Sequence, residues 1–92
     1  MPHNMRRPIE QQLYRALIDS EFRFIERGCW KAQEVCNAVQ IHFPELCDDH
    51  YYCWEHCWSG YRQPEWAHVV RNAMQKSNSV QYNRDLKCYT FR

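Results

Sequence analysis

The stretch from residue 64 to residue 91 constrains the fold more than any other part of this chain of 92 residues. At about 100° per residue, the apolar side chains of residues 64–76 fall on one face of a helix and the polar ones on the other. Two short runs with strand character follow, 77–81 and 87–91, and Asn83-Arg84-Asp85 between them is typical of a tight turn. A helix that leads into a short hairpin indicates a winged helix.

The two faces of this helix carry different kinds of side chain. The inward face holds Trp66, Val69, Val70 and Ala73, and the outward face holds His68, Arg71, Asn72 and Gln75. Asn and Gln can hydrogen-bond adenine edges and Arg can bond guanine, whereas a solvated surface more often carries Glu and Lys. We therefore expect the helix to read the major groove of duplex DNA. The alternative is plain solvation, which is the usual state of an Arg on a helix surface.

The distribution of charged residues along the chain supports DNA binding better than the net charge does. The chain has 12 Lys and Arg against 11 Asp and Glu, a formal charge of +1, which argues against a protein that coats nucleic acid unselectively. Residues 58–92, however, carry six basic and two acidic side chains. We expect Arg62 to approach the DNA backbone, and Arg84 and Lys87 on the wing to contact phosphates or the minor groove.

Two more helices are expected ahead of the wing. Apolar residues recur at three-to-four spacing from Pro8 to about residue 26, and Gly28 is suited to end that helix. A second periodic unit covers residues 31–42 and is stopped by Pro44. The sequence therefore predicts a flexible tail over residues 1–7 and one domain over residues 8–92. Its fold class is mainly α with a small β-hairpin, a winged helix-turn-helix of three helices plus a two-stranded wing.

Residues 47–63 show neither helical nor strand period, and we expect them to form an irregular loop rich in cysteine, histidine and aromatic residues. A loop of this length is entropically costly to order, and a structural zinc ion would offset that cost. The best ligand set is Cys47, Cys53, His56 and Cys57, although their spacing does not match the paired Cys-x2-Cys pattern of most zinc sites. The alternative is that aromatic packing orders the loop around thiols without metal. Core or near-core thiols are expected at Cys29, Cys36 and Cys88.

A second function is open for the same region. The segment 45–61 is acidic and aromatic, which suits a protein interface better than a DNA surface. Self-association through Trp54, Trp58 and Tyr61 would give a homodimer that could read two half-sites, and another protein could bind there instead. The alternative function is therefore a protein-protein interaction module, for dimerisation or inhibition.

Other classes of protein are disfavoured. The chain has two glycines and no glycine-rich phosphate loop, and no histidine or aspartate is placed to orient a Cys-His pair, so we do not expect an enzyme. It has no apolar stretch long enough to cross a membrane, and its first eight residues lack the apolar run of a secretory signal. We expect a cytoplasmic protein.

Several segments together resemble a known family. They are Phe43-Pro-Glu-Leu-Cys-Asp-Asp49, then Cys53, Cys57 and Gly60, then Pro64-Glu-Trp-x-His-x-Val-Arg-Asn-Ala-Met-Gln75 with a short hairpin after it. Over about residues 30–92 they look like the winged-helix domain of Mrr-type restriction systems. The resemblance implies a duplex-DNA-reading head in which Arg71, Asn72 and Gln75 form the reading face. No nuclease module follows the wing, so the resemblance does not imply cleavage.

Overall fold

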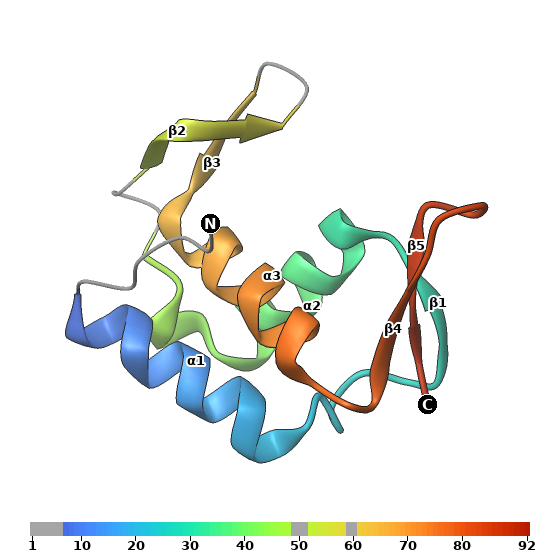
Figure 1. Ribbon diagram of the computed structural model, residues 1–92. Helices are drawn as coiled ribbons and strands as arrows, with labels where there is room; N and C mark the ends of the chain where they lie inside the picture. The colour runs from blue at the N-terminus through green and yellow to red at the C-terminus, as the bar shows by residue number, and fades with distance from the viewer. Residues whose placement is uncertain (1–6, 49–51, 59–60) are drawn as a thin grey trace.

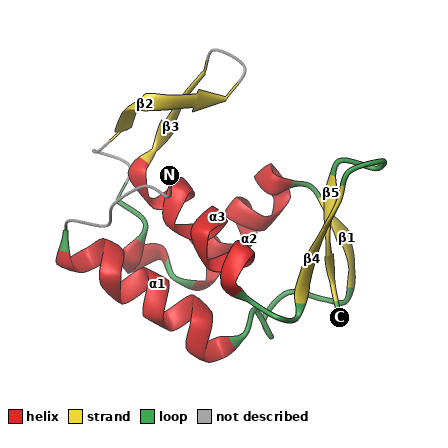
Figure 2. Cartoon of the chain, viewed as in Figure 1, coloured by secondary structure: helices red, strands yellow, loops and turns green. Residues whose placement is uncertain are grey.

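The computed structural model describes residues 7–48 and 64–92 in full, and the backbone of residues 52–58 and 61–63. Within these residues there are three α-helices: α1 (Pro8–Ser20), α2 (Ala32–His42) and α3 (Glu65–Lys76). A short 3₁₀ turn, η1 (Pro44–Leu46), follows α2, and the strands are β1 (Gly28–Trp30), β2 (Tyr52–Trp58), β3 (Tyr61–Pro64), β4 (Val80–Asn83) and β5 (Cys88–Phe91). The helices lie between a three-stranded sheet on one side and the β2–β3 hairpin, which projects on the other (Figures 1 and 2).

The prediction of three helices with a small hairpin after the last one is confirmed, but the two-stranded wing is wrong. The sheet has three antiparallel strands in the order β1-β5-β4. Strand β1 pairs Gly28 with Phe91 and Trp30 with Tyr89, far along the chain. Three residues are too few to show an alternating pattern, so nothing local distinguishes this strand from a loop. A winged-helix arrangement as such stays a prediction.

The first helix is shorter than its predicted range of 8–26. It ends at Ser20, because Glu21 and Phe22 adopt left-handed backbone angles, with φ of 53° and 57°. The chain then turns, and Phe22 and Ile25 are buried in the core although they are no longer helical. The apolar residues that seemed to continue the helical period therefore belong to the connection between α1 and β1, which packs into the core without being helical.

The first six residues of the predicted flexible tail lie outside the described part of the chain, and the seventh, Arg7, belongs to the start of α1. Arg7 caps the start of α1, where its carbonyl accepts hydrogen bonds from the amides of Glu10 and Gln11. Its guanidinium also donates to the carboxylate of Asp48, with 2.9 Å between the nitrogen and the oxygen. This ion pair ties the beginning of α1 to the segment that follows η1.

Residues 47–63 are not an irregular loop throughout, because β2 and β3 form an antiparallel hairpin there. Tyr52 pairs with Pro64 and Cys53 with Gln63, but Trp58 pairs with Tyr61, so the register shifts between the two ends. Such a shift interrupts the alternation of side chains between the two faces. That interruption explains why the sequence lacks a clean strand period here.

The core lies between α1, α2, α3 and the inner face of the three-stranded sheet. The predicted inward face of α3 is confirmed, since all four of its apolar residues are buried: Trp66, Val69, Val70 and Ala73. Tyr89 and Phe91 from β5 are also buried, and Val80 from β4 packs against the same cluster. These inward side chains hold the hairpin to the helices.

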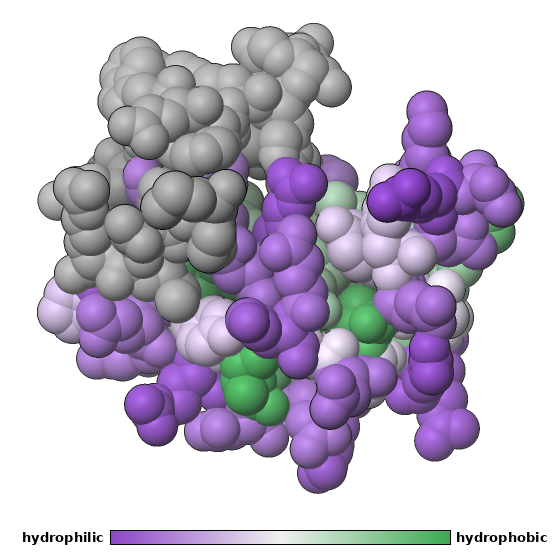
Figure 3. Space-filling model, in the orientation of Figure 1, coloured by the Kyte–Doolittle hydropathy of each residue, from purple (hydrophilic) through white to green (hydrophobic). Residues whose placement is uncertain are grey.

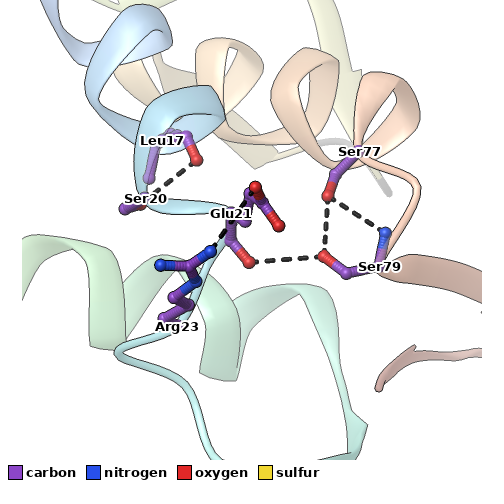
Figure 4. A network of polar contacts seen from close by, with 6 residues as sticks. All are labelled: Leu17, Ser20, Glu21, Arg23, Ser77 and Ser79. Carbon is purple, nitrogen blue, oxygen red and sulfur yellow. Dashed lines mark hydrogen bonds and ion pairs between the residues drawn. The ribbon is translucent and has the colours of Figure 1, made fainter.

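The left-handed residue that ends α1 offers a test of backbone strain. The amide of Glu21 donates to the carbonyl of Ile18. The carbonyl of Glu21 accepts from the Ser79 hydroxyl at 3.3 Å (Figure 4). Glycine could keep both backbone contacts without a Cβ penalty. It would lose the exposed 3.7 Å ion pair with Arg23, which contributes little. We expect Glu21→Gly to raise the free energy of unfolding by about 0.5 kcal/mol, measured by denaturant titration.

The matched control for this prediction is Asp19→Gly, two residues earlier and inside α1. Glycine at a helical position is expected to cost about 1 kcal/mol. If both variants are destabilised to the same extent, the left-handed geometry at Glu21 does not strain the chain.

Candidate nucleic-acid interface

Helix α3 is the central helix of the domain, and this changes the role of its polar face. It packs mainly against α1 and also contacts α2, β3 and β4. His68, predicted to face DNA, is buried with 5 % of its surface exposed, so its placement on an outward face is wrong. Arg71 and Asn72 are half-buried, and Gln75 is exposed. The predicted reading residues that keep exposed surface therefore lie toward the carboxyl end of α3.

Three of the predicted DNA-binding residues come together at that end. Arg71 and Gln75 from α3 and Lys87 from the turn before β5 line one open hollow of 410 Å³. We call it the Arg71 hollow, and its other lining residues are Ala32, Tyr82 and Tyr89. In the view of Figure 3, the surface over α3 and the sheet is largely hydrophilic, with small pale and green areas between them. The hollow thus offers two cations and an amide beside aromatic rings.

Two tyrosines form the aromatic wall of the Arg71 hollow. Tyr82 of β4 and Tyr89 of β5 are paired across the hairpin, with ring centroids 4.9 Å apart and planes tilted by 55°. Tyr82 is 49 % exposed, whereas Tyr89 is buried. Burial raises the pKa of the Tyr89 phenol, and the positive charge of Arg71, which also donates a hydrogen bond to it, partly opposes the rise. Arg71 and Tyr89 thus lie near each other in the lining of the hollow.

The sequence analysis did not predict that Tyr82 and Tyr89 would line a hollow together with the cations. It gave neither Tyr82 nor Tyr89 a role in binding. The alternation of side chains along the two strands of the hairpin could have indicated it. Tyr82 and Tyr89 are opposite each other on neighbouring strands and so share one face of the sheet. What the sequence lacks is the position of α3 over that face.

The remaining predicted DNA-binding residues lie elsewhere or are not described in full. Arg84 is exposed and lines a separate hollow of 310 Å³ with Gln81, Asn83 and Thr90, next to Tyr82. Asn72 is on α3 but does not line the Arg71 hollow. Arg62 is on β3, and its side chain lies outside the description. The structure therefore brings together three of the seven residues and separates Arg84 from them.

The predicted zinc ligands are only partly described. Cys47 is buried and belongs to the core cluster. Cys53, His56 and Cys57 all lie on β2, and their side chains are outside the description. Elsewhere in the described part of the chain, no group of three or more His, Cys, Asp and Glu residues is placed to hold a metal ion. A zinc site at these four residues stays a prediction.

The predicted interface residues share the projecting hairpin. Trp54 and Trp58 are on β2 and Tyr61 is on β3, and for all three the backbone alone is described. Of the cysteines expected in or near the core, Cys36 and Cys88 are buried. Cys29 is exposed, so that expectation is wrong for it: β1 is at the sheet edge and directs its side chain to solvent.

Comparison with known proteins adds no family to this picture. No protein-family model, no curated protein and no solved structure matches the chain. The resemblance to Mrr-type winged helices therefore stays a prediction from the sequence segments that carry it. None of the helices in the described residues has the length and apolar character needed to span a bilayer.

Proposed function

We propose that this protein binds duplex DNA and that the Arg71 hollow receives a backbone phosphate. The observation that carries the proposal is the convergence of Arg71, Gln75 and Lys87 from two elements onto one open hollow. Two cations and an amide donor suit a phosphate oxygen, and Arg in particular can bond phosphate through two N–H groups at once. The excess of basic over acidic side chains in residues 58–92, six against two, supports the same partner.

The burial of α3 changes how the duplex would meet the protein. With His68 in the interior, the helix cannot lie along the major groove over its whole length. The exposed last turn, which ends in Gln75 and Lys76, is the part that can reach base edges. The β4–β5 turn, with Arg84 and Lys87, would lie along the adjacent backbone. Phosphate contacts then dominate, and any base reading is limited to a few positions.

The first experiment is fluorescence anisotropy of the protein with a labelled random-sequence duplex at several salt concentrations. We expect the logarithm of the affinity to fall linearly with the logarithm of salt, with a slope that corresponds to about three to six phosphate contacts. An absence of binding at low salt would overturn the proposal.

Lys87→Gln is the sharpest surface variant for this proposal. Lys87 is exposed, and glutamine keeps a similar length while it removes the charge. We expect weaker binding to every duplex alike and a salt slope reduced by about 1, measured by the same anisotropy titration. Arg15→Gln is the matched control, because it also removes one exposed charge but lies on α1, away from the hollow. Equal losses in both variants would mean that net charge alone governs binding.

The projecting hairpin favours a second candidate function, a protein-protein interaction module. The β2–β3 hairpin stands away from the helices (Figure 1). Its sequence includes Trp54, Trp58 and Tyr61, residue types that often anchor protein interfaces. If the hairpin mediates self-association, Trp58→Ala should shift the protein from dimer to monomer in sedimentation velocity. A protein that is monomeric before and after the substitution would remove dimerisation from consideration.

A further inference from the structure

Two cysteines, Cys29 and Cys88, lie in diagonal positions on the outer face of the three-stranded sheet, the face turned away from the core cluster. In the register of β1 and β5, Cys29 lies opposite Thr90, and its sulfur is 3.4 Å from the Thr90 hydroxyl oxygen. Cys88 precedes Thr90 by two residues on β5, so the alternation of a strand places it on the same face. The two thiols are near enough for each to shift the pKa of the other. Tyr89 and Phe91 belong to the core cluster on the opposite face.

The two cysteines differ in access and in acidity. Cys29 is exposed, whereas Cys88 is 5 % exposed. Hydrogen bonds from Cys88 and then Thr90 lower the pKa of Cys29, because they stabilise its thiolate. The same bond to Cys29, followed by burial, raises the pKa of Cys88, while Lys31 and Glu34 act on it in opposite directions. The exposed cysteine is thus the one that ionises first and can be reached by a reagent.

We propose that Cys29 and Cys88 form a reversible dithiol-disulfide pair, in which Cys29 reacts first with a low-molecular-weight disulfide and Cys88 then resolves the product. Exposed, acidic thiols beside a second cysteine are the usual sites of such chemistry. This site is separate from the Arg71 hollow and does not depend on DNA binding.

The reaction proceeds by two thiol-disulfide exchanges. The Cys29 thiolate attacks one sulfur of the small disulfide, so the S–S bond of the reagent breaks, a mixed disulfide forms on Cys29 and one small thiolate leaves. Cys88 then loses its proton to solvent and attacks the Cys29 sulfur. The second small thiolate leaves, and the Cys29–Cys88 bond remains. The protein loses two electrons and two protons, and the small disulfide is reduced to two thiols.

Closing the bond requires a small movement of β1. A disulfide holds its two Cβ atoms about 3.8 Å apart, and diagonal neighbours on paired strands are farther apart than that. Strand β1 has three residues and lies at the sheet edge, so it can shift along β5 without disturbing the pairing of β4 with β5. Oxidation would then fasten the segment after α1 covalently to β5.

The sequence makes the product easy to identify. Cleavage after Lys and Arg releases residues 28–31 with Cys29 alone and residues 88–92 with Cys88 alone, while the other four cysteines stay together on residues 32–62. The whole chain is equilibrated with reduced and oxidised glutathione, quenched in acid, alkylated and digested without reductant. We expect a linked pair of peptides 28–31 and 88–92. In Cys88→Ser we expect glutathione to accumulate on peptide 28–31, and in Cys29→Ser none on peptide 88–92.

Two controls keep the result specific. Cys36→Ser should leave the linked product unchanged, since burial raises the pKa of Cys36 to about 12 and its thiol should react at least ~100-fold more slowly than Cys29. Thr90→Val removes one hydrogen bond to the Cys29 thiolate and should slow its alkylation. The proposal is overturned if Cys29 links only to the 32–62 peptide, or if Cys88→Ser does not change the fate of Cys29.

Discussion

Replacing Phe22 with alanine is expected to lower the free energy of unfolding by about 4 kcal/mol, to be measured by urea or thermal denaturation. Phe22 is 2 % exposed and follows the end of α1. Its ring meets Phe91 edge-on with centroids 5.7 Å apart, and it also lies 6.1 Å from the ring of Phe24. Truncation would leave a cavity between the first helix and β5 and remove an aromatic pair. Alanine keeps the left-handed backbone, so strain at this position is not relieved.

Ile41→Ala is the control for this substitution. Ile41 is in α2 and 82 % exposed, so its truncation should change stability by less than about 0.5 kcal/mol. If Phe22→Ala is as mild as Ile41→Ala, Phe22 does not join the first helix to the sheet in the way its contacts indicate.

Arg71→Gln is expected to weaken duplex DNA binding at least about tenfold, or about 1.4 kcal/mol, in the anisotropy titration. Arg71 is the half-buried cation of the Arg71 hollow, and its charge lowers the pKa of the neighbouring Tyr89 phenol. Its guanidinium therefore loses little freedom when a phosphate binds, which makes it worth more than an exposed lysine. We expect a larger loss than for Lys87→Gln.

A separate measurement shows whether Arg71→Gln remains folded with its surroundings intact. Burial raises the pKa of the Tyr89 phenol, and the charge of Arg71 lowers it. Removing Arg71 should therefore raise the Tyr89 pKa further, as measured by spectrophotometric titration. The chain has six tyrosines, so Tyr89→Phe in the same background identifies the curve that belongs to Tyr89. A higher Tyr89 pKa with unchanged affinity would show that Arg71 serves the sheet and not the DNA.

The inner face of α3 was predictable because the helical period fixes which side chains share a face, whatever surrounds the helix. The helical period does not show how many faces of the helix other elements pack against. His68 sits one turn before Arg71 and Asn72 and has the same polar character, yet it is buried, whereas Arg71 and Asn72 keep part of their surface exposed. His68 was wrongly predicted to face DNA because tertiary packing, which the helical period does not show, buries it.

The boundaries of α1 and the strand β1 were missed for a different reason. Apolar residues after Ser20 keep a helical spacing, and the left-handed turn at Glu21 and Phe22 has no glycine to signal it. Strand β1 exists only because β5 pairs with it, and that partner is distant in sequence. The convergence of Arg71 and Lys87 depends on the same sheet, so the Arg71 hollow could not be located before the strand order was known.

The strand order also bears on how the chain folds as it is made. Ribosomes deliver residues from the amino end, so residues 28–30 emerge long before 88–91, which lie between them and β4 in the sheet. Until then β1 has no hydrogen-bonding partner in this sheet, and Phe22 and Ile25 lack the cover of Phe91. The nascent domain must therefore carry exposed apolar surface through most of its synthesis, which gives chaperones a window in which to bind it.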